Sequence, residues 1–174
     1  CILASMQSGS FKIDNVISGS SNINTLEIDL SEISSGIVSE EKFQESSSGV
    51  DLSRAEVIVS VGRGIGKEEN LAMVRDLAKA IGGELASSRP VVDSGWLEPY
   101  HQVGSSGQTV SPKLYLALGI SGAIQHVVGM KGSKNIVVIN KDANAPIFEI
   151  ADYGVVGDLF EIVPKLITAI QEIK

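Results

Sequence analysis

The sequence predicts an α/β protein built on a doubly wound parallel sheet, preceded by a short segment of different character. Two observations predict this fold. Strand-length runs such as Val57 to Val61 (VIVSV) are almost continuously apolar, which is typical of strands buried on both faces of a parallel sheet. These runs alternate with segments whose apolar residues recur at helical spacing, and such alternation is typical of parallel strands joined by helices.

The first 53 residues differ from the rest in composition. They are rich in serine and glycine and carry eight acidic and two basic side chains, whereas residues 54–174 carry 13 and 12. Short alternating runs at 11–13, 16–17 and 25–28 predict a β-ribbon, and Ser46–Gly49 predicts a flexible linker. Because residues 1–53 have too few apolar side chains for a core of their own, we expect them to lie against a partner or another domain, with a linker leading to a main domain at 54–174.

The main domain is expected to begin with a strand and a helix. Val57–Val61 predicts a buried strand, and the glycines of residues 62–66 predict a turn after it. Apolar residues then recur at helical spacing from Leu71 to Ile81, and Gly82-Gly83 ends that helix. A second short strand is expected at Glu84–Ser87.

The second half is expected to hold two more strands and a final helix. The strands are Leu114–Leu118 and Ile136–Asn140, and residues 153–157 are interpreted as a glycine-rich turn. An apolar stripe from Leu159 to Ile170 predicts the helix, with Asp158 as its N-cap. Pro164 interrupts the stripe and predicts a kink, or a helix that restarts with Pro164 in its first turn.

The most informative stretch is Leu114–Met130 (LYLALGISGAIQHVVGM). A strand ends there at Gly119, a turn of small residues follows, and then comes a potentially helical segment that holds His126. A ligand can approach exposed backbone N–H groups at such a turn, so we expect a ligand site at the carboxyl ends of the strands. Asn140 and Asp158 are expected at the same edge, where Asn140 can bind a ribose or phosphate group and Asp158 can accept a hydrogen bond from an adenine or a ribose hydroxyl. Capping of the last helix is a second role for Asp158.

Two arginines are expected near this edge. The run GRGIG at residues 62–66 lacks full GxGxxG spacing, but its glycines let the backbone approach a phosphate that Arg63 can bind. Arg89 precedes Pro90, which we expect to keep Arg89 extended and pointing from the sheet edge at negative charge. A solvated arginine is the alternative interpretation at both positions.

Residues 93–112 predict a loop of about twenty residues, a length that is usually functional inside a compact domain. Its Gly104-Ser105-Ser106-Gly107 run offers two hydroxyls between glycines, suited to hydrogen-bonding a ligand, although a plain turn is the alternative. His101 is expected to be a loop histidine without a role. For His126, a packed or solvent-facing side chain is the alternative to ligand binding.

Several function classes lack support in the sequence. A net charge of −7 and a pI near 4.8 argue against nucleic acid as a partner. No apolar run approaches the ~20 residues of a membrane helix, and no secretory signal is visible. The single cysteine, Cys1, allows no internal disulfide, and a chain that starts there resembles a fragment of something longer. No residues have the spacing of a metal site or of a hydrolytic catalytic set.

Five runs, in order along the chain, resemble one family. They are SRPVVDSGW, HQVGSSGQTVSPKLY, GISGAIQH, NKDANAPIFEIADYG and VVGDLFEIVPKLI. Together they resemble the C-terminal FAD-binding domain of the electron transfer flavoprotein alpha subunit, over roughly Arg54 to Lys174. Residues 1–53 resemble only loosely the tail of that subunit's first domain. The resemblance implies a Rossmann-like, DHS-like fold that binds FAD.

The resemblance also implies a role for each matching residue. Arg89 would lie beside the isoalloxazine ring, His126 would donate to flavin O2, and Ser106 would bond flavin N5. Many family members carry glutamine where this chain has Ser105. The positions that match FAD contacts of the family are Arg63, Ser88, Arg89, Val103, Gly104, Ser105, Ser106, Ser121, Gly122, Ala123, Ile124, Gln125, His126, Asn140, Asp158 and Leu159.

The resemblance implies an electron carrier rather than an enzyme. Such a carrier passes electrons from flavoprotein dehydrogenases of the acyl-CoA type to a quinone reductase or another acceptor, through an anionic semiquinone that Arg89 and His126 would stabilise. The implied partner is the beta subunit, in a heterodimer located in the bacterial cytoplasm or the mitochondrial matrix. Ser106 with the following Thr109-Val110 is similar to alpha subunits of bifurcating systems.

Two other functions remain open from the residues. One is an NAD-binding domain of a hydride-transfer enzyme, which the incomplete glycine signature and the non-acidic end of the second strand (Ser87-Ser88) disfavour. The other is a structural module in which FAD only holds two subunits together. Bound flavin absorbs visible light, so an absorbance spectrum distinguishes FAD from NAD.

Overall fold

The computed structural model describes residues 5, 17–25, 27 and 49–173. The chain divides into two units, and the fold described below belongs to the unit that contains Val50–Lys174. Among the described residues, the first buried side chain along the chain is Leu52, and the domain start expected at Arg54 stays a prediction. Within the described residues, no helix is both long and apolar enough to cross a membrane.

The described part of the other unit carries no regular structure. Residues 17–25 form neither helix nor strand, and Ile17 and Ile23 are 91% and 88% exposed. Of the predicted ribbon only Ile17, Thr25 and Glu27 are described, and none of the three lies in a strand, so the ribbon stays a prediction. The run at 11–13, Val16, Leu26, Ile28 and most of the predicted linker lie outside the described residues.

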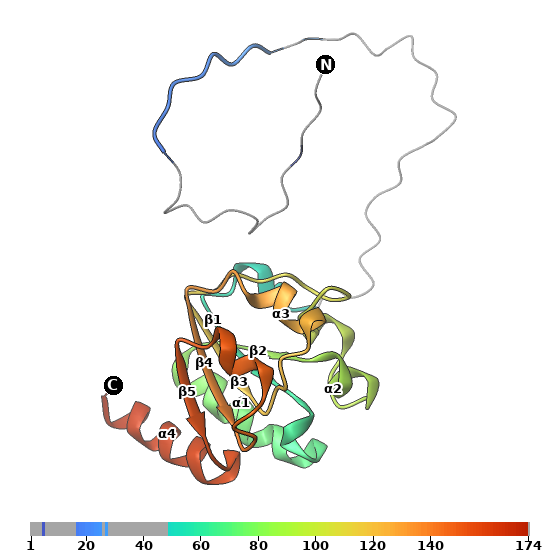
Figure 1. Cartoon of the computed structure of the whole chain (residues 1–174), viewed down its shortest axis with the longest axis vertical. Coiled ribbons are helices and arrows are strands. Elements are labelled where there is room, and N and C mark those ends of the chain that lie inside the picture. Colours follow the sequence, from blue (N-terminus) through green and yellow to red (C-terminus); the bar gives the residue numbers. More distant parts are fainter. Residues whose placement is uncertain (1–4, 6–16, 26, 28–48, 174) are drawn as a thin grey trace. The chain divides into compact units, whose positions relative to one another are not determined.

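Five parallel strands form one sheet in the order β2-β1-β3-β4-β5 (Figure 1). The strands are Val57–Val61 (β1), Glu84–Ser87 (β2), Leu114–Leu118 (β3), Asn135–Asn140 (β4) and Tyr153–Val156 (β5). The predicted parallel α/β fold and its first four strands are confirmed. The chain runs from β1 to one edge strand, β2, and then returns to build the other side from β3 onward. The order of the strands thus reverses between β1 and β3.

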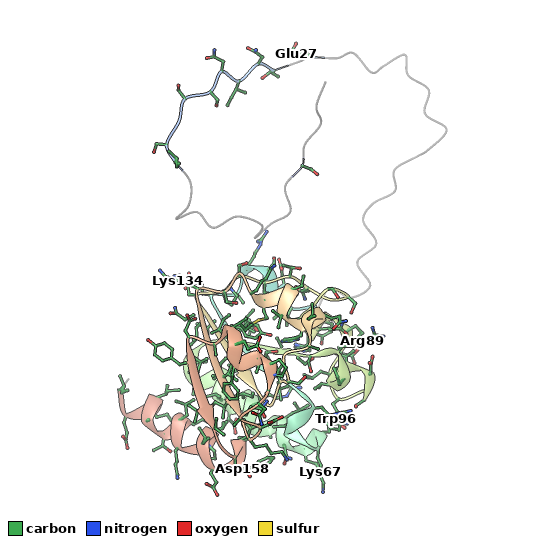
Figure 2. The ribbon with its side chains drawn as sticks, viewed as in Figure 1. Glu27, Lys67, Arg89, Trp96, Lys134 and Asp158 are labelled. Carbon is green, nitrogen blue, oxygen red and sulfur yellow. The ribbon has the colours of Figure 1, made fainter. Side chains whose placement is uncertain are left out.

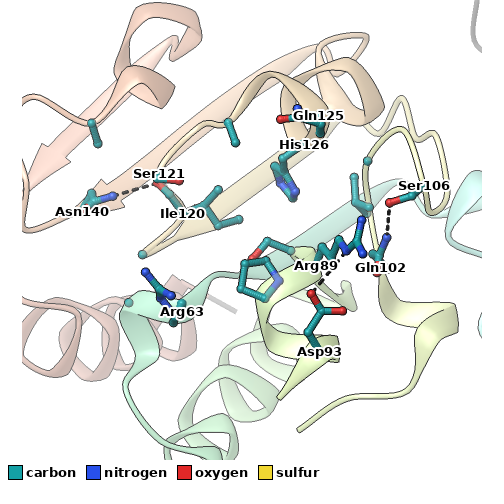
Figure 3. Close-up of a pocket in the computed structure, with 18 of the residues that line it drawn as sticks. Arg63, Arg89, Asp93, Gln102, Ser106, Ile120, Ser121, Gln125, His126 and Asn140 are labelled. Atoms are coloured by element: carbon teal, nitrogen blue, oxygen red, sulfur yellow. Dashed lines mark hydrogen bonds and ion pairs between the residues drawn. The ribbon is translucent and has the colours of Figure 1, made fainter. Parts of the chain in front are cut away.

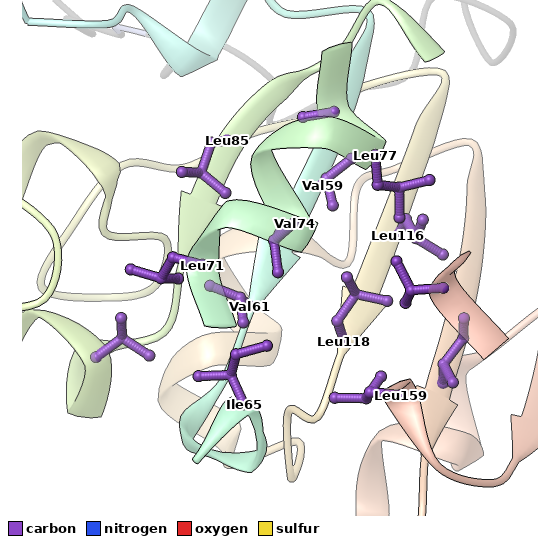
Figure 4. Close-up of a cluster of buried hydrophobic side chains, with 14 of the residues drawn as sticks. Val59, Val61, Ile65, Leu71, Val74, Leu77, Leu85, Leu116, Leu118 and Leu159 are labelled. Atoms are coloured by element: carbon purple, nitrogen blue, oxygen red, sulfur yellow. The ribbon is translucent and has the colours of Figure 1, made fainter. Parts of the chain in front are cut away.

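The inner strands β1, β3 and β4 have buried side chains on both faces of the sheet, since alternate residues of a strand point to opposite sides. Leu116 and Leu118 of β3 pack with α1 (Leu71–Ile81) and α4 (Leu159–Ile173) on one face, as Figure 4 shows. Tyr115 and Ala117 of the same strand pack on the other face. That face is covered by α3 (Ile124–Met130) and the 3-10 helix Pro146–Ile150.

Helices α1 and α4 form where helical spacing predicts them. The N-cap of α4 is confirmed, because a side-chain oxygen of Asp158 accepts a hydrogen bond of 2.8 Å from the Phe160 N–H; Figure 2 shows Asp158 at the start of this helix. The predicted restart at Pro164 is wrong, since α4 continues through this residue. Buried Leu159 and Val163 before the proline, and Leu166 after it, hold both parts against the same core.

Strand β5 replaces the turn predicted at residues 153–157. It pairs with β4 as a parallel edge strand, with Val155 opposite Ile139. All four of its residues are exposed, so no burial pattern marks the strand in the sequence. Tyr153, Val155 and Val156 nevertheless have the aromatic and β-branched side chains that strands favour.

The turns after β1 and β3 contact each other through their backbones. The N–H of Gly62 donates to the Leu118 carbonyl (2.8 Å), and the N–H of Gly64 donates to the Gly119 carbonyl (3.1 Å). A Cβ on Gly62 would lie 2.3 Å from the Gly119 oxygen, so this contact requires glycine. The contact fixes the two turns at the point where the strand order reverses.

We expect Gly62→Ala to lower the free energy of unfolding by about 3 kcal/mol, because the new methyl group meets backbone that cannot move aside. Gly82→Ala is the matched control. Gly82 has φ +70°, but a Cβ added there would have no neighbouring atom within 4 Å, so only left-handed strain of about 1 kcal/mol is expected. Urea denaturation measures both losses. Equal losses for the two variants would contradict the backbone contact.

Candidate functional site

A cavity of about 810 Å³ lies at the carboxyl ends of the first four strands (Figure 3). This volume is within the range of roughly 300–1,000 Å³ that is common for small-molecule sites. The cavity is therefore found at the sheet edge where the sequence predicts a ligand. The turns after β1, β2, β3 and β4, the starts of α2 (Arg89–Asp93) and α3, and the loop at residues 93–112 supply its lining.

Most of the residues predicted to bind a cofactor line this cavity. They come from separate parts of the chain, and the folded sheet brings them together. These residues are Arg63, Ser88, Arg89, Val103, Gly104, Ser105, Ser106, Ser121, Ala123, Gln125, His126 and Asn140.

Four other predicted residues are not in the cavity lining. Gly122 has φ +92° and lies against the Ile147 backbone, and Ile124 is 77% exposed. Asp158 caps α4, and Leu159 belongs to the core beneath that helix. Direct contact of these four residues with a cofactor stays a prediction.

Arg89 is helical rather than extended, so that expectation is wrong. It begins the short helix α2 (Arg89–Asp93), and the extended residue is Ser88, with ψ 157°. Pro90 has no N–H, but residues in a first helical turn need no intrahelical acceptor, so the helix tolerates it. The Arg89 guanidinium Nε lies 3.3 Å from an Asp93 carboxylate oxygen, and both side chains are more than half exposed.

The loop predicted to be functional forms one wall of the cavity. The Gln102 side-chain amide donates to the Ser106 hydroxyl oxygen at 2.9 Å. Because that oxygen acts as the acceptor, the hydroxyl hydrogen of Ser106 is free to donate to a ligand. Gln102 is not among the predicted site residues, since nothing in its spacing shows that it would contact Ser106.

Close backbone packing holds this loop against α3. The N–H of Ser105 donates to the Gln125 carbonyl at 2.8 Å. Gly104 has φ +143°, and a Cβ there would lie 2.8 Å from the same carbonyl oxygen. Gly104 therefore lets the serine-bearing loop approach the helix that carries His126.

Asn140 links two strand ends instead of presenting a free amide. Its side-chain nitrogen donates to the Ile120 carbonyl (2.8 Å), and its side-chain oxygen accepts from the Asp142 N–H (3.0 Å). One N–H of the amide group is left for a ligand. The first effect of Asn140 is thus to hold the turns after β3 and β4 together.

His126 is a buried histidine at the cavity. Its Nε2 atom lies 2.9 Å from the Tyr115 hydroxyl, while Nδ1 is buried without a hydrogen-bond partner among the described residues. Burial lowers the pKa of His126 to about 4, and the neighbouring Val103 carbonyl raises it by a smaller amount. The imidazole is therefore neutral at pH 7. A neutral ring with an unpaired nitrogen is suited to hydrogen bonding with a bound molecule.

The other histidine has a structural role. Nδ1 of His101 lies 2.7 Å from the Leu85 carbonyl, and burial lowers the pKa of this side chain. A carbonyl can only accept, so Nδ1 of His101 carries the proton. His101 thereby ties the long loop to β2, and no ligand role is predicted for it.

Charges at the cavity have both signs. Arg63, Arg89 and Lys141 are cationic, and Asp93 and Asp142 are anionic. No group of three metal-ligating side chains occurs within the described residues. The arrangement is suited to an organic ligand that carries negative charge and hydrogen-bond acceptors.

The comparisons with known proteins agree on one family. Residues 51–131 match the family model described as the electron transfer flavoprotein FAD-binding domain. The chain is 52% identical over 131 residues to the electron transfer flavoprotein subunit alpha of Thermoanaerobacterium thermosaccharolyticum. These residues make up 75% of this chain and 40% of that protein.

Two further relatives match a similar region. The protein FixB of Escherichia coli O139:H28 is 56% identical over 125 residues, which is 71% of this chain and 40% of FixB. The acryloyl-CoA reductase electron transfer subunit beta of Anaerotignum propionicum is 59% identical over 126 residues, 71% of this chain and 34% of that protein. The matched region thus spans about two fifths or less of these relatives.

The low pKa of His126 predicts a pH dependence of stability. An unfolded histidine has a pKa near 6.5, so between pH 6.5 and 4 the unfolded chain binds more protons at this site than the folded chain does. Lowering the pH through this window therefore destabilises the fold. We expect His126 to lower the free energy of unfolding of wild type by about 3 kcal/mol between pH 7 and pH 4. The variant His126→Gln should lack this contribution.

Urea denaturation of both proteins across this pH range measures the effect. Carboxylates and His101 titrate in both proteins, so they cancel in the difference between the two curves. Parallel curves for wild type and His126→Gln would show that His126 is not held neutral.

Proposed function

Because this chain belongs to the electron transfer flavoprotein alpha-subunit family through its FAD-binding domain, we propose that its cavity holds the flavin ring of FAD and tunes that ring for electron transfer. FAD is the cofactor of this domain. The observation that carries the proposal is the buried Nδ1 of His126, which has no partner among the described residues and belongs to a ring that lines the cavity. A buried polar atom of this kind is costly unless a ligand satisfies it.

The donors around the cavity fit a flavin. The flavin ring carries acceptor atoms at its polar edge, and when bound it supplies a group that takes up and releases electrons singly. Ser106 has a free hydroxyl hydrogen, and His126 has an unpaired nitrogen. The resemblance assigns Ser106 to N5 and His126 to O2 of the ring, and the position of both residues in one cavity supports this assignment.

Three cationic side chains line the cavity. Since the low pKa of His126 keeps its ring neutral at pH 7, Arg63, Arg89 and Lys141 are the cavity side chains that would balance negative charge on bound FAD. His126 adds a hydrogen bond that strengthens as its acceptor gains charge. Together these groups would favour uptake of the first electron.

We further propose that the chain acts as an electron carrier in a heterodimer with a beta subunit. The names of the relatives describe electron transfer subunits, and the relatives are more than twice as long as the matched region. Flavoprotein dehydrogenases of the acyl-CoA type are the proposed donors, in the bacterial cytoplasm. The relative named after acryloyl-CoA reductase supports this class of donor. Bifurcation is proposed only from Ser106 and its following residues.

Replacing His126 should lower the potential at which FAD accepts its first electron. A hydrogen bond to a charged acceptor contributes about 1.5–3 kcal/mol, so we expect His126→Ala to lower this potential by about 60 mV or more. His126→Gln keeps an N–H donor and should shift the potential less. A spectroelectrochemical titration of the FAD-loaded protein measures the shift. An unchanged potential in His126→Ala would exclude the proposed hydrogen bond.

Arg89→Ala should lower the same potential, because a positive charge beside the cavity is lost. Arg54→Ala removes an equal charge from an exposed residue that pairs with Asp51 outside the cavity, so it is the matched control. The same titration compares the two variants. Equal shifts would mean that only net charge matters, and a protein that binds no FAD with its beta subunit present would refute the proposed function.

A further inference from the structure

Tyr115 is the residue in contact with the buried imidazole of His126. It lies on β3 and is fully buried on the face that α3 covers, where its hydroxyl is 2.9 Å from His126 Nε2. The two rings meet edge to face at 62°, with centroids 6.1 Å apart. Tyr115 does not line the cavity, so it can influence a ligand there only through His126.

The direction of this hydrogen bond follows from the surroundings of the hydroxyl. Burial raises the pKa of Tyr115 far above its usual value, so the phenol keeps its proton. The neighbouring Ser60 hydroxyl opposes this shift, but its oxygen makes no hydrogen bond with the described residues. Within the described chain, Nε2 of His126 is therefore the acceptor at hydrogen-bonding distance from the buried Tyr115 proton.

This direction determines which nitrogen of His126 carries hydrogen. A neutral imidazole has one N–H, and an Nε2 atom that accepts from Tyr115 cannot hold it. The hydrogen must then be on Nδ1, which has no partner among the described residues. His126, whose ring lines the cavity, thus carries its donor on Nδ1.

We propose that Tyr115 is a positioning residue, which donates to His126 Nε2 and thereby holds the imidazole in the Nδ1–H form that donates to an acceptor of the ligand in the cavity. The identity of that ligand as FAD rests on the proposed function. The arrangement of Tyr115 and His126 does not, because it is present in the protein without a ligand.

Without Tyr115 the ring is no longer restricted to one tautomer. An Nε2–H form would turn the Nδ1 lone pair, instead of a donor, toward an acceptor of the ligand. Two facing acceptors repel each other, so binding would first require a proton shift back to Nδ1. Tyr115 removes this requirement, in the same way that partners behind a metal-binding histidine fix its tautomer.

The tautomer can be measured directly by nitrogen NMR of the ligand-free protein labelled with ¹⁵N-histidine. The chain has two histidines, and His101 provides the reference signal, because its Nδ1 must donate to the Leu85 carbonyl. We expect wild-type His126 to show the same protonated Nδ1 and a bare Nε2. A wild-type spectrum with a protonated Nε2 and a bare Nδ1 would overturn the proposal, even if every variant failed to fold.

Tyr115→Phe removes only the hydroxyl. We expect the Nδ1–H signal of His126 to weaken in favour of Nε2–H, and FAD affinity to fall about threefold to tenfold, as expected for loss of one neutral hydrogen bond. Tyr100→Phe is the matched control, since Tyr100 packs against His101 with ring centroids 4.6 Å apart. It should leave both the His126 tautomer and FAD affinity unchanged.

The two measurements separate the two proposals. If no FAD binds to any form of the protein, the proposed function fails, while the NMR signals still decide the role of Tyr115. If FAD binds but Tyr115→Phe leaves the His126 tautomer as in wild type, the positioning role is refuted and the proposed function remains.

Discussion

The contact between the turns after β1 and β3 is the constraint on which the site depends. In a parallel sheet whose strand order reverses, these two turns leave in opposite directions and open a crevice between them. Here Gly62 and Gly64 bring the first turn onto the backbone of Gly119, at distances that no side chain permits. The position of Arg63 relative to the turn after β3, and through it to α3 and His126, is therefore set by backbone hydrogen bonds.

Local sequence signals predict the parts of the fold that depend on burial. Strands β1 to β4 are recognisable because most of their side chains are buried, whereas exposed β5 has no such pattern. Asp158 is recognisable as a cap because the hydrogen bond is made within two residues. The prediction for Arg89 is wrong because the extended residue before the proline turn is Ser88, one position earlier.

The sequence predicts where the site lies, but it does not predict the hydrogen bonds between the side chains of the site. Glycine turns and small residues at strand ends indicate where a ligand can approach, and the resemblance to a family indicates which residues lie there. The contacts of Gln102 with Ser106 and of Tyr115 with His126 join side chains whose positions depend on the folded loop and on the face of the sheet. Such contacts leave no periodic signal in the sequence. They nevertheless determine which hydrogen atoms the cavity can offer.

The ion pair between Arg89 and Asp93 has a consequence for how charge enters the site. Both side chains are mostly in water, where such a pair contributes at most about 1 kcal/mol. Arg89 can therefore exchange the Asp93 carboxylate for an incoming anion at little energetic expense. The short helix keeps the guanidinium close to where it is needed while leaving it free to change its counterion.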